Sequence, residues 1–126
     1  MRTIYTDGSG WSGIKSAWCV YIKSDISTGI DELFIKVFKT PYTNNEMEYL
    51  AFIKGAELAK SGDKIITDSE LVVKQLKGEY KVKSDNLKKL YIKAKSIVSN
   101  KGILYEHKTR NYNNAGIFLE KTLKLL

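Results

Sequence analysis

The chain has 126 residues, of which 43% are hydrophobic and 28% charged, and a formal net charge of +7. These values are typical of one globular domain, which we expect to span residues 1–126. A single cysteine excludes an internal disulfide, and the sequence shows neither an apolar leader nor an apolar run long enough to cross a membrane, so we expect a cytoplasmic protein without a membrane partner.

The first 40 residues predict three strands joined by short turns. Strand-forming residues alternate over 2–6, 17–23 and 31–40. Between the first two of these segments, Asp7-Gly8-Ser9-Gly10 is typical of a tight turn. Three consecutive strands with short connections favour an antiparallel meander.

From Thr43 onward the hydrophobic pattern changes to a helical period. Thr43 and Glu46 have the spacing of a capping box, which predicts a helix that ends near Lys60. A short strand over 64–67 and helices over 68–76 and 86–98 follow, then a strand over 103–106 and a last helix from about Asn113. The order βββαβααβα predicts an α/β fold with one mixed sheet and helices on its faces.

The positive charge is concentrated in one segment. Residues 74–101 contain nine lysines but only two acidic residues, so this segment alone carries the whole net charge of +7. Such a segment favours a polyanionic partner, with nucleic acid ahead of a membrane surface. A solvated lysine face explains the charge equally well.

Three carboxylates have positions that predict a cation site. Asp7 and Asp68 follow the first and fourth predicted strands, and Glu48 lies in the first turns of the helix between those strands. If the two strands are neighbours, the three side chains meet at one edge of the sheet. Three clustered carboxylates repel one another unless a cation compensates them, and oxygen ligands suit Mg²⁺ or Mn²⁺. Taken singly, each is equally typical of a turn, a helix start or a helix cap.

The segments around these carboxylates resemble the type 1 ribonucleases H. The similarity extends over most of the chain and is carried by residues 5–9 (YTDGS), 43–51 (TNNEMEYLA), 67–73 (TDSELVV) and 78–83 (GEYKVK). The resemblance implies a ribonuclease H-like fold: a five-stranded mixed sheet, with a three-strand antiparallel meander and two parallel strands, flanked by helices. It also implies a single catalytic domain that acts as a monomer.

The same resemblance implies an endonuclease that cuts the RNA strand of RNA/DNA hybrids with two Mg²⁺ or Mn²⁺ ions. Asp7 matches the residue that bridges both ions, and Glu48 and Asp68 match ligands of the ion at the leaving 3′ oxygen. The expected products carry 5′-phosphate and 3′-hydroxyl ends. For Thr43, Asn44 and Asn45, helix capping is a second role that can coexist with substrate contact. The expected substrate-binding residues are Gly8, Ser9, Thr43, Asn44, Asn45, Ser69, Lys81, Lys83 and Arg110.

One position departs from the family pattern. The family supplies a fourth carboxylate at the start of the last helix, where this chain has Gly116. Glu120 lies four residues later, on the same helix face, and we hypothesise that it replaces the missing ligand. The alternative is that Glu120 is a surface charge beside Lys121 and Lys124.

The missing carboxylate leaves two other functions open. The first is a catalytically impaired ribonuclease H-like module that binds nucleic acid, with Gly116 marking the lost site. The second is a nuclease of the same fold that acts on double-stranded RNA or DNA.

Overall fold

The protein is represented by a computed structural model, which describes residues 1–26, 29–109 and 112–125. Its elements, in chain order, are β1 (Thr3–Ser9), β2 (Ser16–Lys23), β3 (Glu32–Phe38), α1 (Asn44–Leu58), β4 (Lys64–Thr67), α2 (Glu70–Leu76), α3 (Asp85–Lys101), β5 (Leu104–His107) and α4 (Asn114–Leu125). The predicted order of elements is confirmed. No helix in these described ranges combines the length and the apolar character needed to cross a bilayer.

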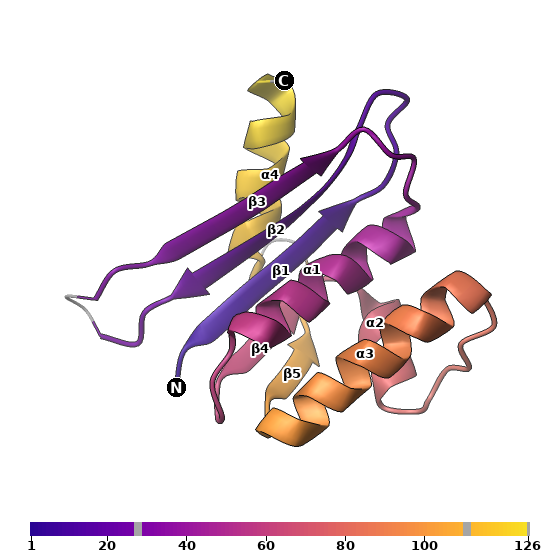
Figure 1. The fold of residues 1–126 in the computed structure, drawn as a ribbon. Helices are drawn as coiled ribbons and strands as arrows, with labels where there is room; N and C mark the ends of the chain where they lie inside the picture. Colours follow the sequence, from indigo (N-terminus) through magenta and orange to yellow (C-terminus); the bar gives the residue numbers. More distant parts are fainter. Residues whose placement is uncertain (27–28, 110–111, 126) are drawn as a thin grey trace.

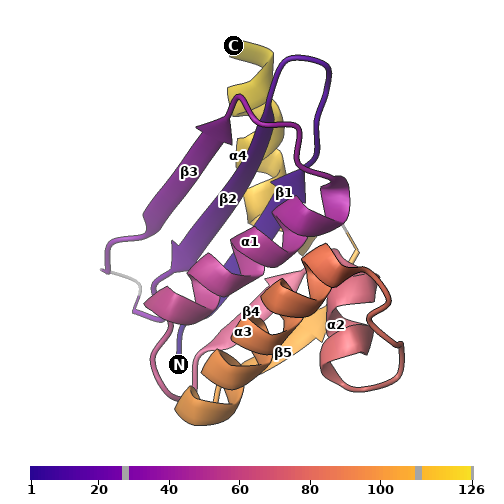
Figure 2. The ribbon, with the colours of Figure 1, turned by 45° about the vertical axis from the view of Figure 1, so that its right-hand side comes forward.

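The strands form one five-stranded sheet in the order β3-β2-β1-β4-β5. β1, β2 and β3 pair antiparallel, whereas β4 lies parallel to both β1 and β5. Helices α1 and α3 cover one face of this sheet and α4 packs against β1 and β2 on the other (Figures 1 and 2). The mixed sheet and its flanking helices have the ribonuclease H-like arrangement that the sequence predicts.

The first strand is longer than predicted. The expected turn at Asp7-Gly8-Ser9 is wrong: these residues continue β1, and they pair with Cys19, Trp18 and Ala17 of β2. The physical reason is that the ladder with β2 continues through Ser9, and glycine is needed at position 8 because a Cβ atom there would lie 2.3 Å from the backbone carbonyl carbon of Met47. Position 8 has no room for a side chain, so the glycine allows α1 to pack directly against the backbone of β1.

The main hydrophobic core lies between the sheet and helices α1 and α3. Its largest fully buried side chains include Tyr49, Phe52 and Ile4. The predicted apolar stripe of α3 faces this core, with Leu87, Ala94 and Val98 buried. A smaller cluster fixes α4 to the opposite face of the sheet, and it consists of Ala17, Cys19, Ala115 and Leu119. Helices therefore pack on both faces of the sheet around β1, the strand that carries Asp7.

Candidate active site

Asp7, Glu48 and Asp68 meet at one edge of the sheet, as predicted. Thr6 of β1 is the parallel partner of Thr67 of β4, so the next residues, Asp7 within β1 and Asp68 just after β4, lie beside each other. One carboxylate oxygen from each of the three residues lies within 4.8 Å of the others. The structure thus brings the three side chains close enough to share a cation.

The cluster has the electrostatic character of a site for a divalent cation. Burial, followed by the negative charges of Asp7 and Asp68, raises the pKa of Glu48 far above its usual value. Oδ1 of Asp68 is buried without a hydrogen-bond partner. A hard cation stabilises carboxylates that repel one another and a buried oxygen atom that lacks a donor, so these partly buried residues fit Mg²⁺ or Mn²⁺.

Glu48 is held by the first turns of α1. The Glu46 N–H donates to Oγ1 of Thr43 (3.1 Å), and the Thr43 N–H donates to Oε1 of Glu46 (3.0 Å), which confirms the predicted capping box. The N–H of Gly8 donates to Oε1 of Glu48 at 2.5 Å, and the N–H of Gly10 donates to Oδ1 of Asn44 at 2.6 Å. The end of β1 and the start of α1 are therefore tied together at the site.

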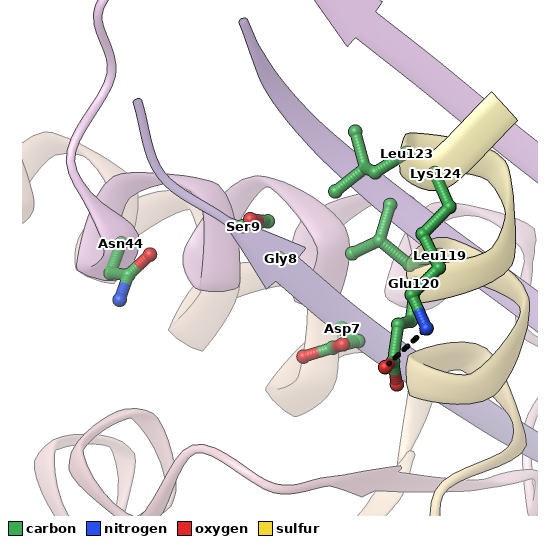
Figure 3. A pocket seen from close by; sticks show the side chains of 8 residues that line it. All are labelled: Asp7, Gly8, Ser9, Asn44, Leu119, Glu120, Leu123 and Lys124. Carbon is green, nitrogen blue, oxygen red and sulfur yellow. Dashed lines mark ion pairs between the residues drawn. The ribbon is translucent and has the colours of Figure 1, made fainter. Parts of the chain in front are cut away.

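Helix α4 brings a fourth carboxylate, Glu120, to the cavity beside Asp7. Gly116 is buried in the first turn of α4, where the family pattern has an acidic residue. Glu120, one turn later, lines a cavity of about 440 Å³ together with Asp7, Gly8 and Ser9 (Figure 3). Glu120 does not belong to the tight group of three carboxylates, and its Oε1 lies 3.4 Å from Nζ of Lys124.

The predicted substrate-binding residues divide into three sets. Gly8, Ser9 and Asn44 line the cavity beside Asp7, and Thr43 and Asn45 are exposed next to it at the start of α1. Ser69 is buried and caps α2 by accepting a hydrogen bond from the Val72 N–H (3.2 Å). Lys81 and Lys83 are exposed in the loop between α2 and α3, outside the cavity, and Arg110 lies outside the described residues.

Two lysines of the basic segment have structural partners. Nζ of Lys101 donates to the carbonyl oxygens of Ala56 (3.0 Å), Glu57 (2.6 Å) and Ala59 (3.0 Å), at the end of α1. Nζ of Lys95 donates to the carbonyl oxygen of Leu76 (2.8 Å), at the end of α2. These ammonium groups stabilise the negative ends of two helix dipoles. The charge available to a polyanion is consequently smaller than the sequence suggests.

The sequence gives only a weak signal for two further residues. Asn113 is fully buried; its Nδ2 donates to the Thr6 carbonyl oxygen at 2.8 Å, and its Oδ1 accepts from the Ala115 N–H at 3.0 Å. An Asn before a helix indicates a cap, but the contact with β1 depends on the fold. Lys124 lines the cavity with Asp7, which its place near the end of a lysine-rich helix does not indicate.

Comparisons with known proteins agree with this structure. No family model matches the chain. The bifunctional protein Rv2228c of Mycobacterium tuberculosis is 39% identical over 61 residues, which are 45% of this chain and 17% of the relative. An uncharacterized protein of Mycobacterium bovis, Mb2253c, matches to the same extent, so the chain spans about a sixth of the length of these curated relatives.

Solved structures match over nearly the whole chain. The RNase H1 called LC11, from a compost metagenome, was solved with an RNA/DNA hybrid; it is 26% identical with a TM-score of 0.79, over 98% of this chain and 99% of that one. RNase H1 of the halophilic archaeon Halobacterium salinarum has the same fold, with a TM-score of 0.83, 23% identity and coverage of 99% and 98%. In its fold, and at 26% sequence identity to LC11, the chain is similar to type 1 ribonucleases H.

Proposed function

We propose that the protein is a metal-dependent endoribonuclease that hydrolyses the RNA strand of RNA/DNA hybrids and leaves 5′-phosphate and 3′-hydroxyl ends. The observation that carries this proposal is the group formed by Asp7, Glu48 and Asp68, with carboxylate oxygens within 4.8 Å of one another at the edge of the sheet. The hybrid bound to LC11, a relative with 26% identity over almost the full chain, supports the choice of substrate.

The four carboxylates would divide between two ions. Asp7 would contact both metal ions. Glu48 and Asp68 would hold one of these ions, and Glu120 would hold the other from the opposite side of the cavity. Two bound Mg²⁺ or Mn²⁺ ions would supply an activated water and stabilise the charge on the leaving oxygen. The role of this chain is to fix the carboxylates before substrate arrives, because β1, β4 and α1 are tied together by backbone pairing and caps.

The substrate would be selected on the α1 side of the cavity. Asn44, Ser9 and the backbone of Gly8 line the cavity, and Asn45 and Thr43 are exposed beside them, so polar groups face an incoming strand. Such groups distinguish RNA from DNA through the 2′-hydroxyl in the shallow minor groove. The exposed Lys81 and Lys83 would attract backbone phosphates without selecting a sequence. Ser69 would act mainly through the cap that places α2 behind Asp68.

A strand-specific cleavage assay tests the proposal. A hybrid labelled with different dyes on its RNA and DNA strands is incubated with the protein and Mg²⁺ or Mn²⁺. We expect cuts in the RNA strand alone, loss of cleavage in Asp7→Asn, and products that a 5′-phosphate-dependent exonuclease degrades. Equal cleavage of a DNA duplex or of double-stranded RNA would contradict the substrate assignment.

Gly116 supports one competing function, a module that binds hybrids without cutting them. Its position in the first turn of α4 leaves no side chain there to hold the ion that activates water. In the same assay this module would retain hybrid binding but yield no product with either metal. The Gly116→Asp variant would then gain cleavage, whereas an enzyme that already uses Glu120 would be active without it.

A further inference from the structure

The cavity beside Asp7 has a second wall, formed by α4, which carries a lysine that the metal site does not explain. α4 contributes Leu119, Glu120, Leu123 and Lys124 to it, opposite the end of β1 and the start of α1 (Figure 3). Among the described residues that line the cavity, Lys124 is the one cation. A cation at this position would offset the electrostatic repulsion between the two acidic residues and a polyanionic strand that enters the cavity.

The ammonium group of Lys124 has capacity for a further ligand. Oε1 of Glu120 lies 3.4 Å from Nζ, and a lysine ammonium carries three N–H donors. The Lys124 side chain is 75% exposed, so the pair with Glu120 leaves this group accessible from solvent and from the cavity. Glu120 and Lys124 lie one helical turn apart and both line the cavity, and their exposed pair does not bury the charge of the lysine.

We propose that Lys124 is a phosphate-binding residue that holds a backbone phosphate of the RNA strand next to the phosphate that is cut. This inference rests on the proposed function, since it takes the strand bound at Asp7 to be the one that enters the cavity. The contact is electrostatic and independent of sequence, and it positions the strand without touching the reacting atoms.

The alternative role for Lys124 is a purely local one. A lysine in the last turn of a helix is stabilised by the helix dipole, and an i,i+4 pair with a glutamate adds a small amount. A local role of this kind predicts no effect on nucleic-acid binding beyond the loss of one positive charge. It also predicts that replacing Lys124 acts only by moving Glu120, so that the change appears in the metal affinity.

Hybrid binding without divalent metal separates the two roles. Fluorescence anisotropy with a labelled RNA/DNA hybrid in EDTA gives the Kd at several salt concentrations for the wild type, Lys124→Ala and Lys124→Arg. Lys121→Ala is the matched control, because Lys121 is exposed on the same helix and does not line the cavity. A second readout is the Mn²⁺ affinity of each variant without nucleic acid.

We expect Lys124→Ala to weaken hybrid binding about fivefold and to reduce the slope of log K against log salt by about one, while Lys121→Ala changes both far less. Lys124→Arg should bind like the wild type, and the Mn²⁺ affinity of Lys124→Ala should be unchanged. Equal effects of Lys124→Ala and Lys121→Ala, or an effect confined to Mn²⁺ affinity, would overturn the inference about Lys124 alone. A wild-type protein that does not bind the hybrid would instead contradict the proposed function.

Discussion

Nδ2 of Asn113 donates a hydrogen bond of 2.8 Å to the backbone carbonyl oxygen of Thr6, the residue before Asp7. The same side chain accepts from the N–H groups of Ala115 (3.0 Å) and Gly116 (3.4 Å), at the start of α4. One buried amide therefore caps the helix that carries Glu120 and fixes this helix to the strand that carries Asp7. The separation between the two carboxylates depends on this contact.

Replacing Asn113 should destabilise the protein more than an ordinary polar substitution does. Asn113→Ala removes a helix cap and leaves a buried carbonyl without its donor, for which we expect a loss of roughly 2–4 kcal/mol in the free energy of unfolding. Urea denaturation followed by circular dichroism measures this loss. Asn114→Ala, at the first residue of α4, is the control and should change stability by less than about 0.5 kcal/mol. Equal losses in the two variants would contradict the role of Asn113.

Divalent metal should stabilise the folded protein through the carboxylate cluster. Ligands that bind only the folded state add about 2.7 kcal/mol at a concentration of 100 times Kd, so Mg²⁺ or Mn²⁺ should raise Tm in a concentration-dependent way. Asp7→Asn should abolish most of this rise, because Asp7 is the ligand proposed to hold both ions. Asp85→Asn, which removes a carboxylate that is 96% exposed on α3, should retain it. Calorimetric scans with and without metal give the comparison, and a metal-induced rise that persists in Asp7→Asn would place the ion elsewhere.

Glu120 should behave as a metal ligand that a carboxylate at position 116 can replace. Glu120→Gln should lower kcat by at least about tenfold, which corresponds to about 1.4 kcal/mol of transition-state stabilisation. Adding Gly116→Asp to this variant should restore part of the activity and of the Mn²⁺ affinity. Calorimetric titration with Mn²⁺ measures the metal affinity of the single and double variants, and a cleavage assay measures their kcat. Unchanged Mn²⁺ binding and turnover in Glu120→Gln would assign the residue to the surface.

The lysines of the basic segment should divide into two functional groups. Lys81→Ala combined with Lys83→Ala should reduce the salt slope of hybrid binding by about two, because both side chains are exposed in a loop. Lys101→Ala should leave the slope unchanged and lower stability by roughly 1–2 kcal/mol, since Nζ donates to three carbonyls at the end of α1. A reduced slope in Lys101→Ala would show that this ammonium also contacts phosphate.

Stability should fall in acid partly through Asp63. Burial tends to raise the pKa of this carboxyl, but hydrogen bonds from the Lys60 and Arg2 N–H groups and from the Arg2 guanidinium outweigh burial and lower the pKa below 3.8. A lowered folded-state pKa contributes stability that is present above pH 3.8 and is lost as the pH falls through the folded value.

Asp63→Asn should therefore cost roughly 2–4 kcal/mol at pH 7, and the difference from the wild type should shrink below about pH 4. Urea denaturation at a series of pH values measures this change. A difference that stays constant down to pH 2 would contradict the assignment of the pH dependence to Asp63.

Local sequence rules predicted most of the fold and the centre of the site. The capping box at Thr43 and the period of α3 depend on neighbouring residues, and both are confirmed. The proximity of Asp7 and Asp68 follows from their places after adjacent, parallel residues of β1 and β4, although β1 continues beyond Asp7. Each of these predictions rests on a sequence pattern within one helix or strand, or on the order of the helices and strands along the chain.

Contacts between distant segments were not accessible from the sequence. The length of β1 depends on its pairing with β2, the need for glycine at position 8 on the approach of α1, and the role of Lys101 on α3 passing the end of α1. The place of Lys124 beside the cavity depends on how α4 crosses the sheet. These features arise from the packing of helices on the sheet, which no local pattern encodes.

We expect the carboxylates around Asp7 to bind the divalent metal with which the protein cuts RNA. Anomalous diffraction from crystals soaked in Mn²⁺ tests it most directly, because it locates the ions by element. We predict one Mn²⁺ peak bound by Asp7, Glu48 and Asp68, and a second between Asp7 and Glu120. Absence of any Mn²⁺ peak within bonding distance of Asp7 at saturating metal would contradict the claim.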